Sequence, residues 1–226
     1  MASGLPTSPA PPAIPSRPAK MPPLQNGDRL SIGEFERRYA ATPANIKAEL
    51  IEGVVYMSKP ASDGANGKPR FDLIAWLGFF RAATPGLVGG ANGTLCLDLD
   101  NLPQPDVMLF ISPSHGGKTR TSDDDFVVGA PEFIAEIAAT SASFDLHVKL
   151  NAYRRSGVRE YLVWRTYGQA IDWFMLREGE YIKLQPNAAG LYQSQVFPRP
   201  VARRGGTPAR RSGPSVANPT ARQRHP

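Results

Sequence analysis

Several features that identify common protein classes are missing from this chain of 226 residues. Its one cysteine, Cys96, excludes an internal disulfide and a zinc site built from cysteines. The three histidines are too scattered along the chain for a histidine zinc site. The chain has no apolar stretch of transmembrane length, and its proline-rich N-terminus lacks the apolar segment of a signal peptide. These absences predict a cytoplasmic protein without membrane contact.

Acidic residues are absent from both ends of the chain. Residues 1–26 are rich in Pro, Ala and Ser, residues 198–226 are rich in Arg, Pro, Gly and Ala, and neither stretch has hydrophobic periodicity. Such segments bury too little apolar surface to offset the entropy lost on ordering, so two disordered tails are expected. Residues 27–197, between them, have a suitable length for one domain with its own core.

The net charge of +6 comes from these tails, because they contain nine of the 26 basic residues and none of the 20 acidic ones. The central span keeps 17 basic and 20 acidic residues, a net charge of about −3. A flexible arginine-rich tail could attract nucleic acid without sequence preference. A solvated tail with no partner is an equally good interpretation.

Hydrophobic periodicity and turn signals predict helices and strands in mixed order. Helices are expected at 31–39, 70–83 and 144–155. Ser31 with Glu34 has the spacing of a capping box, and Gly157 is a C-cap candidate. Strands are expected at 48–51, 54–57, 94–99, 106–111, 133–139, 160–165, 170–176 and 181–185, with turns at Glu52-Gly53 and Glu178-Gly179. The pattern is typical of an α/β or α+β sheet protein.

Two of these segments carry further expectations. The apolar residues of the helix at 70–83 cover more than one face, which predicts that the helix is well buried. Residues 86–93 are rich in glycine but lack the strand-glycine-helix context of a dinucleotide-binding motif. We interpret them as a loop.

Two carboxylates are joined to apolar segments of strand length. Glu136 lies inside the run 133–139, and Asp106 opens the run 106–111. Burying an ionised carboxylate costs several kcal/mol unless a metal or a partner charge compensates it. Two such carboxylates therefore suggest a shared cation. Carboxylate oxygens suit Mg²⁺, with Mn²⁺ as an alternative.

Lys149 lies on the next predicted helix, at the edge of the stripe that should face the core. Taken alone, it could extend its ammonium into water or pair with Asp145, four residues earlier. If the strands are neighbours, Lys149 instead converges with the carboxylates of Asp106, Glu136 and Glu49, the last at the start of another strand. A lysine there could orient an attacking water or stabilise charge on a phosphate.

The chain also resembles the Uma2 family of the restriction-endonuclease-like superfamily, which is named for its PD-(D/E)-x-K motif. The resemblance rests on the segments 48–58, 104–107, 134–138 and 145–161, whose order and spacing agree. It implies a mixed central sheet flanked by helices and metal-dependent cleavage of DNA phosphodiester bonds. DNA is then the expected partner, and a homodimer is compatible with the family.

The resemblance also implies residue roles. Asp106 and Glu136 would bind the metal, with Glu49 as a supporting acidic ligand. The lysine of the motif usually lies two residues after the second carboxylate, where this chain has Ala138. Migration of the lysine to the next helix is known in the superfamily, so Lys149 is the catalytic candidate.

The chain departs from the family in two places. Many members have a histidine at the start of the first long helix, where this chain has no histidine in residues 68–72. Arg70 in this segment could still contact a phosphate, but a histidine role is lost. Beyond residue 196 members usually continue with an apolar segment, whereas this chain becomes arginine-rich.

The sequence therefore predicts a Mg²⁺-dependent endonuclease of restriction-endonuclease-like fold. The alternative is a catalytically inactive DNA-binding or interaction module of the same fold, which binds DNA largely through the arginine-rich tail. Without the resemblance, a metal-dependent hydrolase acting on another substrate fits the residues equally well.

Overall fold

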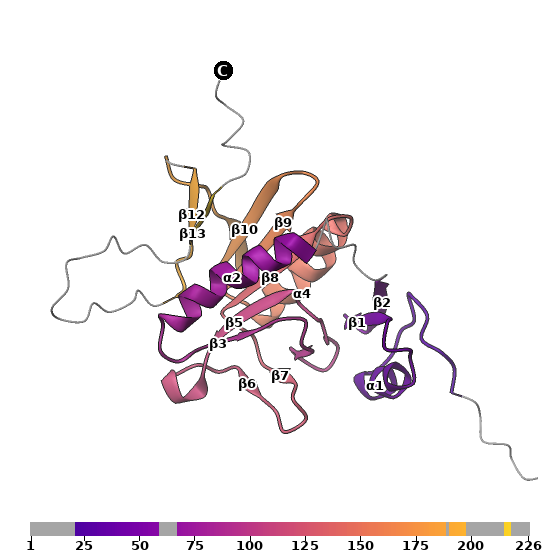
Figure 1. Ribbon diagram of the computed structural model, residues 1–226. Helices are drawn as coiled ribbons and strands as arrows, with labels where there is room; N and C mark the ends of the chain where they lie inside the picture. The colour runs from indigo at the N-terminus through magenta and orange to yellow at the C-terminus, as the bar shows by residue number, and fades with distance from the viewer. Residues whose placement is uncertain (1–20, 59–66, 189, 198–214, 218–226) are drawn as a thin grey trace, which may run out of the picture.

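The structure is a computed structural model that describes residues 21–58, 67–188 and 190–197 and the backbone of 215–217. At its centre lies a six-stranded sheet in the order β11-β10-β9-β8-β5-β3 (Figure 1). β8 and β9 are parallel, and the other neighbouring pairs are antiparallel. The strands are β3 (Leu87–Gly90), β5 (Val107–Ile111), β8 (Phe133–Ala138), β9 (Glu160–Arg165), β10 (Ala170–Arg177) and β11 (Glu180–Lys183). The predicted mixed sheet is confirmed.

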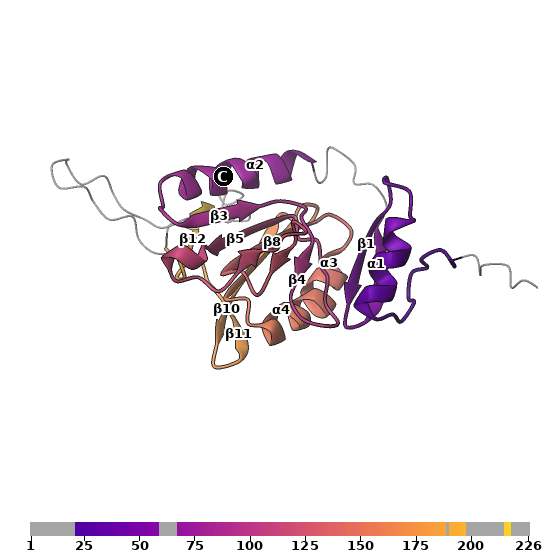
Figure 2. The ribbon, with the colours of Figure 1, turned by 90° about the horizontal axis from the view of Figure 1, so that it is seen from below.

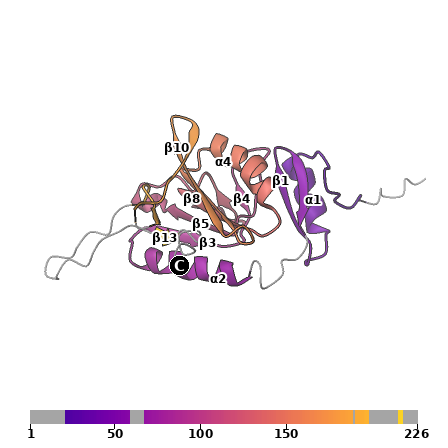
Figure 3. The same cartoon turned by 90° about the horizontal axis from the view of Figure 1, so that it is seen from above.

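Helices cover both faces of this sheet (Figures 2 and 3). α2 (Lys68–Ala82) lies along one face. The opposite face is covered by a continuous helical segment formed by α3 (Ala142–Phe144), a π-helical turn (Asp145–Lys149) and α4 (Leu150–Ser156). Gly157 ends α4 in a left-handed conformation, with φ 86°, as the sequence predicted.

The N-terminal part forms a separate layer beside the sheet (Figure 2). It consists of α1 (Ile32–Ala40) and a hairpin of β1 (Lys47–Ile51) and β2 (Val54–Ser58). The predicted turn at Glu52-Gly53 is confirmed, and both residues have positive φ. The predicted capping-box hydrogen bond is wrong, because the Ser31 side chain makes no cap and Glu34 pairs with arginines of its own helix.

The pleat of the sheet sorts side chains between two cores. Residues Leu109, Phe133 and Ala135 pack in the cluster that contains the inner face of α2. Met108 and Ile134 pack in the cluster that contains Tyr153 of α4. Because successive residues of a strand point to opposite faces, Glu136 is expected on the α4 side with Ile134. This places its carboxylate next to the helix that follows β8.

The expectation that α2 is buried on several faces is wrong. Only Leu73 and Leu77 are buried, whereas Phe71 and Phe79 are 72% and 82% exposed. The helix lies on the outside of the layered fold (Figure 2), so only its inner stripe contacts the sheet. Apolar residues around the whole helix could not reveal this, because composition does not show what covers the outer face.

The interpretation of residues 86–93 as a loop is also wrong, because they include the edge strand β3, paired with β5. Gly90 lies opposite Met108, and a Cβ at Gly90 would come within 2.8 Å of the Met108 methyl group. Glycine here permits close packing in a strand, which a sequence pattern does not separate from a flexible loop.

The smaller elements lie around the central sheet. The strand expected at 94–99 shortens to β4 (Leu95–Cys96), which joins β6 (Arg120–Thr121) and β7 (Val127–Val128) in a three-stranded sheet. A 3-10 turn (Pro113–His115) follows β5. β12 (Leu191–Gln193) pairs with β13 (Ser215–Ala217). No helix in the described parts of the chain is long and apolar enough to cross a membrane.

Of the two predicted tails, residues 1–20, 198–214 and 218–226 lie outside the described residues. Leu24, in the first of them, is buried in the core between α1 and the β1–β2 hairpin. β13 lies in the second, where no regular structure was expected.

Candidate active site

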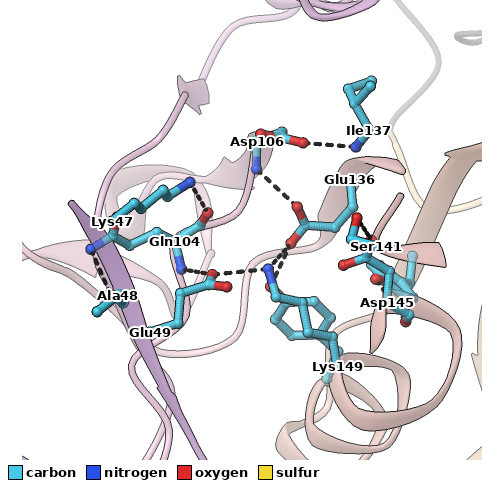
Figure 4. Close-up of polar contacts among 12 residues, drawn as sticks. Lys47, Ala48, Glu49, Gln104, Asp106, Glu136, Ile137, Ser141, Asp145 and Lys149 are labelled. Carbon is cyan, nitrogen blue, oxygen red and sulfur yellow. Dashed lines mark hydrogen bonds and ion pairs between the residues drawn. The ribbon is translucent and has the colours of Figure 1, made fainter. Parts of the chain in front are cut away.

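Two neighbouring strands place the predicted carboxylates side by side. Asp106 immediately precedes β5, and Glu136 lies in β8, one step beyond the register pair Val107 and Ala135. The backbone N–H of Asp106 donates to Glu136 Oε2 at 3.3 Å, and the N–H of Ile137 donates to Asp106 Oδ2 at 2.7 Å (Figure 4). Both carboxylates are therefore fixed by the antiparallel pairing itself.

Lys149 points into the same place from the end of the π-helical turn (Figure 4). Its Nζ lies 2.9 Å from Glu136 Oε1 and 2.9 Å from Glu49 Oε1, and the residue is only 4% exposed. The interpretation that its ammonium extends into water is therefore wrong. A π-turn holds one extra residue and often occurs at functional sites. The convergence expected for Glu49, Asp106, Glu136 and Lys149 is present.

Glu49 reaches the site from β1, outside the central sheet. Its Oε1 accepts from Lys149 and from the backbone N–H of Gln104, the latter at 2.5 Å. The side-chain amide of Gln104 donates through Nε2 to the backbone carbonyl of Ala48 at 3.3 Å. Glu49 thus connects the β1–β2 hairpin both to the lysine and to the segment that leads into Asp106.

Two further side chains complete the site and were not predicted as site residues. The Tyr153 hydroxyl donates to Glu136 Oε1 at 3.0 Å. Asp145 is buried and accepts a hydrogen bond from the Ser141 hydroxyl at 2.5 Å. Tyr153 lies four residues after Lys149 on the same helix face, and a buried tyrosine usually gives its hydroxyl a partner. That rule is the signal by which Tyr153 could have been found.

Burial and the charge of the ion-pair partner shift the pKa values of Glu136 and Lys149 in opposite directions. Burial raises the pKa of Glu136 to about 8, against the lowering effect of Lys149, and the carboxylates of Asp106, Asp145 and Glu49 raise it further. Burial likewise raises the pKa of Asp145. Burial alone would lower the pKa of Lys149, but Glu136 and Glu49 hold it above its usual value. The lysine is therefore charged at neutral pH, and the carboxylates are crowded.

The cluster opens into a cavity of about 770 Å³. Glu49, Asp106, Glu136 and Asp145 line it together with the cationic Lys47, Arg70 and Lys149. Arg70, in the first turn of α2, forms an ion pair with Asp106 Oδ1. A cavity with four carboxylates facing three cations at buried strand ends has the size and polarity of a ligand site.

Comparison with known proteins identifies the chain's family. A model of the Uma2 family, described as "Putative restriction endonuclease", matches residues 32–202. The chain belongs to the Uma2 family. No curated protein matches it.

Among solved structures, this Uma2 chain is similar to the crystal structure of "a putative nuclease belonging to DUF820" from Anabaena variabilis ATCC 29413. The TM-score is 0.52 at 14% sequence identity, and the match covers 68% of this chain and 86% of that one. At this identity the likeness shows the fold. The restriction-endonuclease-like fold expected from the sequence is confirmed.

The site of this Uma2 chain has the donor chemistry for a divalent ion. Carboxylate oxygens are the ligands that Mg²⁺ and Mn²⁺ prefer, and Asp106 and Glu136 present theirs at one cavity wall. Within the described ranges, no three acidic, histidine or cysteine side chains form a ready-made metal site. The carboxylates are organised around Lys149 and Arg70 instead. A divalent ion would thus have to compete with the protein's own cations.

Proposed function

We propose that this Uma2-family protein is a Mg²⁺-dependent endonuclease that hydrolyses phosphodiester bonds of DNA, with Mn²⁺ as an alternative ion. The observation that carries the proposal is the ion pair of Lys149 with Glu136, in which Nζ lies 2.9 Å from Oε1. Both residues line the cavity that Asp106 also lines. An acidic pair on adjacent strands and a lysine from the helical segment that follows match the residue types of the PD-(D/E)-x-K motif. The family supports a nuclease, and DNA is the substrate proposed for it.

Asp106 and Glu136 would hold the ion, with Glu49 assisting. The ion would supply Lewis-acid polarisation of a phosphoryl oxygen and a lowered pKa for the attacking water. Glu49 reaches the site from outside the central sheet, and its Oε1 accepts from Lys149 and from the backbone N–H of Gln104. Its second contribution is to fix the position of Lys149.

Lys149 would position the attacking water and stabilise negative charge on the phosphate. Its ammonium is held from two sides, by Glu49 and Glu136, and cannot swing into solvent without breaking both contacts. Such a preorganised charge in a water-poor site stabilises a transition state more than a flexible one does. Tyr153 fixes the Glu136 carboxylate that faces it.

The alternative, an inactive DNA-binding or interaction module, is favoured by one specific observation. Asp106 pairs with Arg70, and Glu136 pairs with Lys149, so both carboxylates have cationic partners within the chain. An acidic site neutralised in this way could serve stability alone. DNA binding would then depend on the arginine-rich C-terminal segment and fall steeply with salt.

A metal titration and a cleavage assay on the full chain distinguish the two functions. Wild type should bind Mn²⁺ saturably by isothermal titration and nick supercoiled DNA with Mg²⁺ but not with EDTA. Asp106→Asn should lose both properties, whereas Asp123→Asn, which removes an exposed charge in a loop, should keep them. Metal-independent DNA binding that disappears on deletion of residues 199–226, with no cleavage, would establish the alternative.

A further inference from the structure

Arg70 is the least satisfied charged side chain of the cavity. One of its terminal nitrogens pairs with Asp106, but its Nε is buried and has no hydrogen-bond partner among the described residues. The side chain is 25% exposed and lines the cavity. A buried donor without a partner is costly, and in native proteins it often marks the place of a missing ligand.

The unpartnered donor, Arg70 Nε, indicates what kind of ligand this side chain could bind. A guanidinium presents five N–H donors in a planar fork that fits the oxygens of a phosphate in a two-pronged manner. Arg70 offers part of this fork to Asp106 and keeps the buried Nε free of protein acceptors among the described residues. The Arg70 guanidinium would therefore bind an oxyanion that enters the cavity.

The position of Arg70 also sets up a competition. Its guanidinium contacts Oδ1 of Asp106, one of the two carboxylates proposed to hold the metal ion. The other oxygen, Oδ2, is engaged by the backbone N–H of Ile137. A divalent ion at Oδ1 would lie beside the guanidinium, and the repulsion between the two cations weakens the hold of Asp106 on each of them.

We infer that Arg70 alternates between two anionic partners: Asp106 in the empty site, and a backbone phosphate of the nucleic acid once Asp106 binds a metal ion. The inference rests on the proposed function, which it deepens by assigning a substrate contact and a coupling between metal and phosphate. Metal binding releases the guanidinium from Asp106 and makes it available to the phosphate. The two ligands therefore favour each other's binding.

Mn²⁺ titration of the full chain tests the competition directly, without DNA or turnover. Arg70→Gln should tighten Mn²⁺ binding about tenfold, because the competing charge is gone. The matched control is Lys68→Gln, which removes an equal charge from the same turn of α2 at a position that is exposed and does not line the cavity. It should leave the Mn²⁺ affinity unchanged.

Binding of a short fluorescent DNA duplex tests the second partner. With Ca²⁺ present, Arg70→Gln should weaken DNA binding about tenfold and reduce the salt slope by about one phosphate contact. In EDTA it should have little effect, because Arg70 is then paired with Asp106. Lys68→Gln should act equally in both conditions. Arg70→Lys, which keeps the charge but loses the fork, should leave Mn²⁺ affinity near wild type and still weaken DNA binding.

The outcomes separate this inference from the proposed function. If Arg70→Gln binds Mn²⁺ no more tightly than wild type, and Asp106→Asn abolishes binding, the competition is wrong and the metal site stands. If neither wild type nor Arg70→Gln binds Mn²⁺, both ideas fail. Binding by Arg70→Gln alone would support the competition and contradict the proposed function, which requires wild type to bind the ion. Circular dichroism and the response of Arg70→Lys separate these results from misfolding.

Discussion

Two buried carboxylates of the central sheet, Glu136 of β8 and Asp172 of β10, differ in where their cations lie. Asp172 of β10 is as buried as Glu136 and pairs with Arg165 and Lys183, whose side chains are 35% and 48% exposed. Glu136 pairs with a lysine that is itself buried and surrounded by further carboxylates. One carboxylate with two cations reached from solvent is a structural contact. Several carboxylates crowded beside a cavity have the character of a ligand site.

The first prediction concerns Lys149, the cation of the crowded cluster, which contains the carboxylates of Glu49, Asp106, Glu136 and Asp145. Lys149→Met should cost about 3–5 kcal/mol of unfolding free energy, because it leaves buried carboxylates without their partner. It should also reduce DNA cleavage at least about a hundredfold. Urea unfolding and the plasmid assay measure the two effects. A variant as stable as wild type would mean that the buried ion pairs contribute nothing, and the contrast with the Asp172 cluster would disappear.

The two clusters should also respond to pH with opposite sign. Burial raises the pKa of Glu136 to about 8, above its usual value, so the folded state binds a proton that the unfolded state releases. The stability of wild type relative to Glu136→Gln should therefore fall as pH rises from about 4 to 8, by at least about 1 kcal/mol. Urea unfolding in EDTA across this range measures it.

For Asp172 burial alone would raise the pKa, but hydrogen bonds from Lys183 and Arg165 outweigh it and hold the pKa below its usual value. The stability that Asp172 contributes is present above its unfolded pKa of about 3.9 and is lost as pH falls through the folded pKa. The advantage of wild type over Asp172→Asn should therefore shrink below about pH 4. Parallel pH profiles for Glu136→Gln and Asp172→Asn would contradict the proposed difference.

The third prediction removes one hydrogen bond from the crowded cluster. Tyr153→Phe deletes the hydroxyl that donates to Glu136 at 3.0 Å and leaves the packing of the ring. It should cost about 1–3 kcal/mol, since a buried acceptor loses one of its donors. The matched change is Tyr181→Phe, whose hydroxyl donates to the Val158 carbonyl at 2.9 Å. It should cost about 1 kcal/mol and leave cleavage unchanged.

The sequence was informative about the crowded cluster because carboxylates interrupt apolar runs there. Glu136 and Asp106 were identified from that conflict, and the turn at Glu178-Gly179 and the bounds of β9 also follow from local signals. The placement of Lys149 needed the assumption that strands distant in sequence are neighbours. The π-helical turn that carries it has no signature in residue propensity, since it differs from an α-helix by one inserted residue.

Other features could not be predicted because they depend on tertiary neighbours. Asp172 lies in an alternating strand, and nothing in that pattern shows that two cations from adjacent strands reach it. The pairing of Arg70 with Asp106 joins residues 36 positions apart and depends on how α2 crosses the sheet. The exposure of the outer face of α2 likewise depends on how the helix lies on the sheet. Periodicity indicates which residues can share a face, but the elements that cover that face are set by the whole fold.

The smallest effect is expected at Asp172, whose two cations are reached from solvent. Lys183→Met removes one of two cations from Asp172, but Arg165 remains, with its Nε 2.6 Å from the carboxylate. Because the Lys183 side chain is half exposed, solvent replaces much of the lost interaction, and the cost should be about 0–1 kcal/mol. Cleavage and Mn²⁺ affinity should not change. A loss of stability as large as that of Lys149→Met would show that the number and exposure of the cations do not decide how strongly a buried carboxylate depends on them.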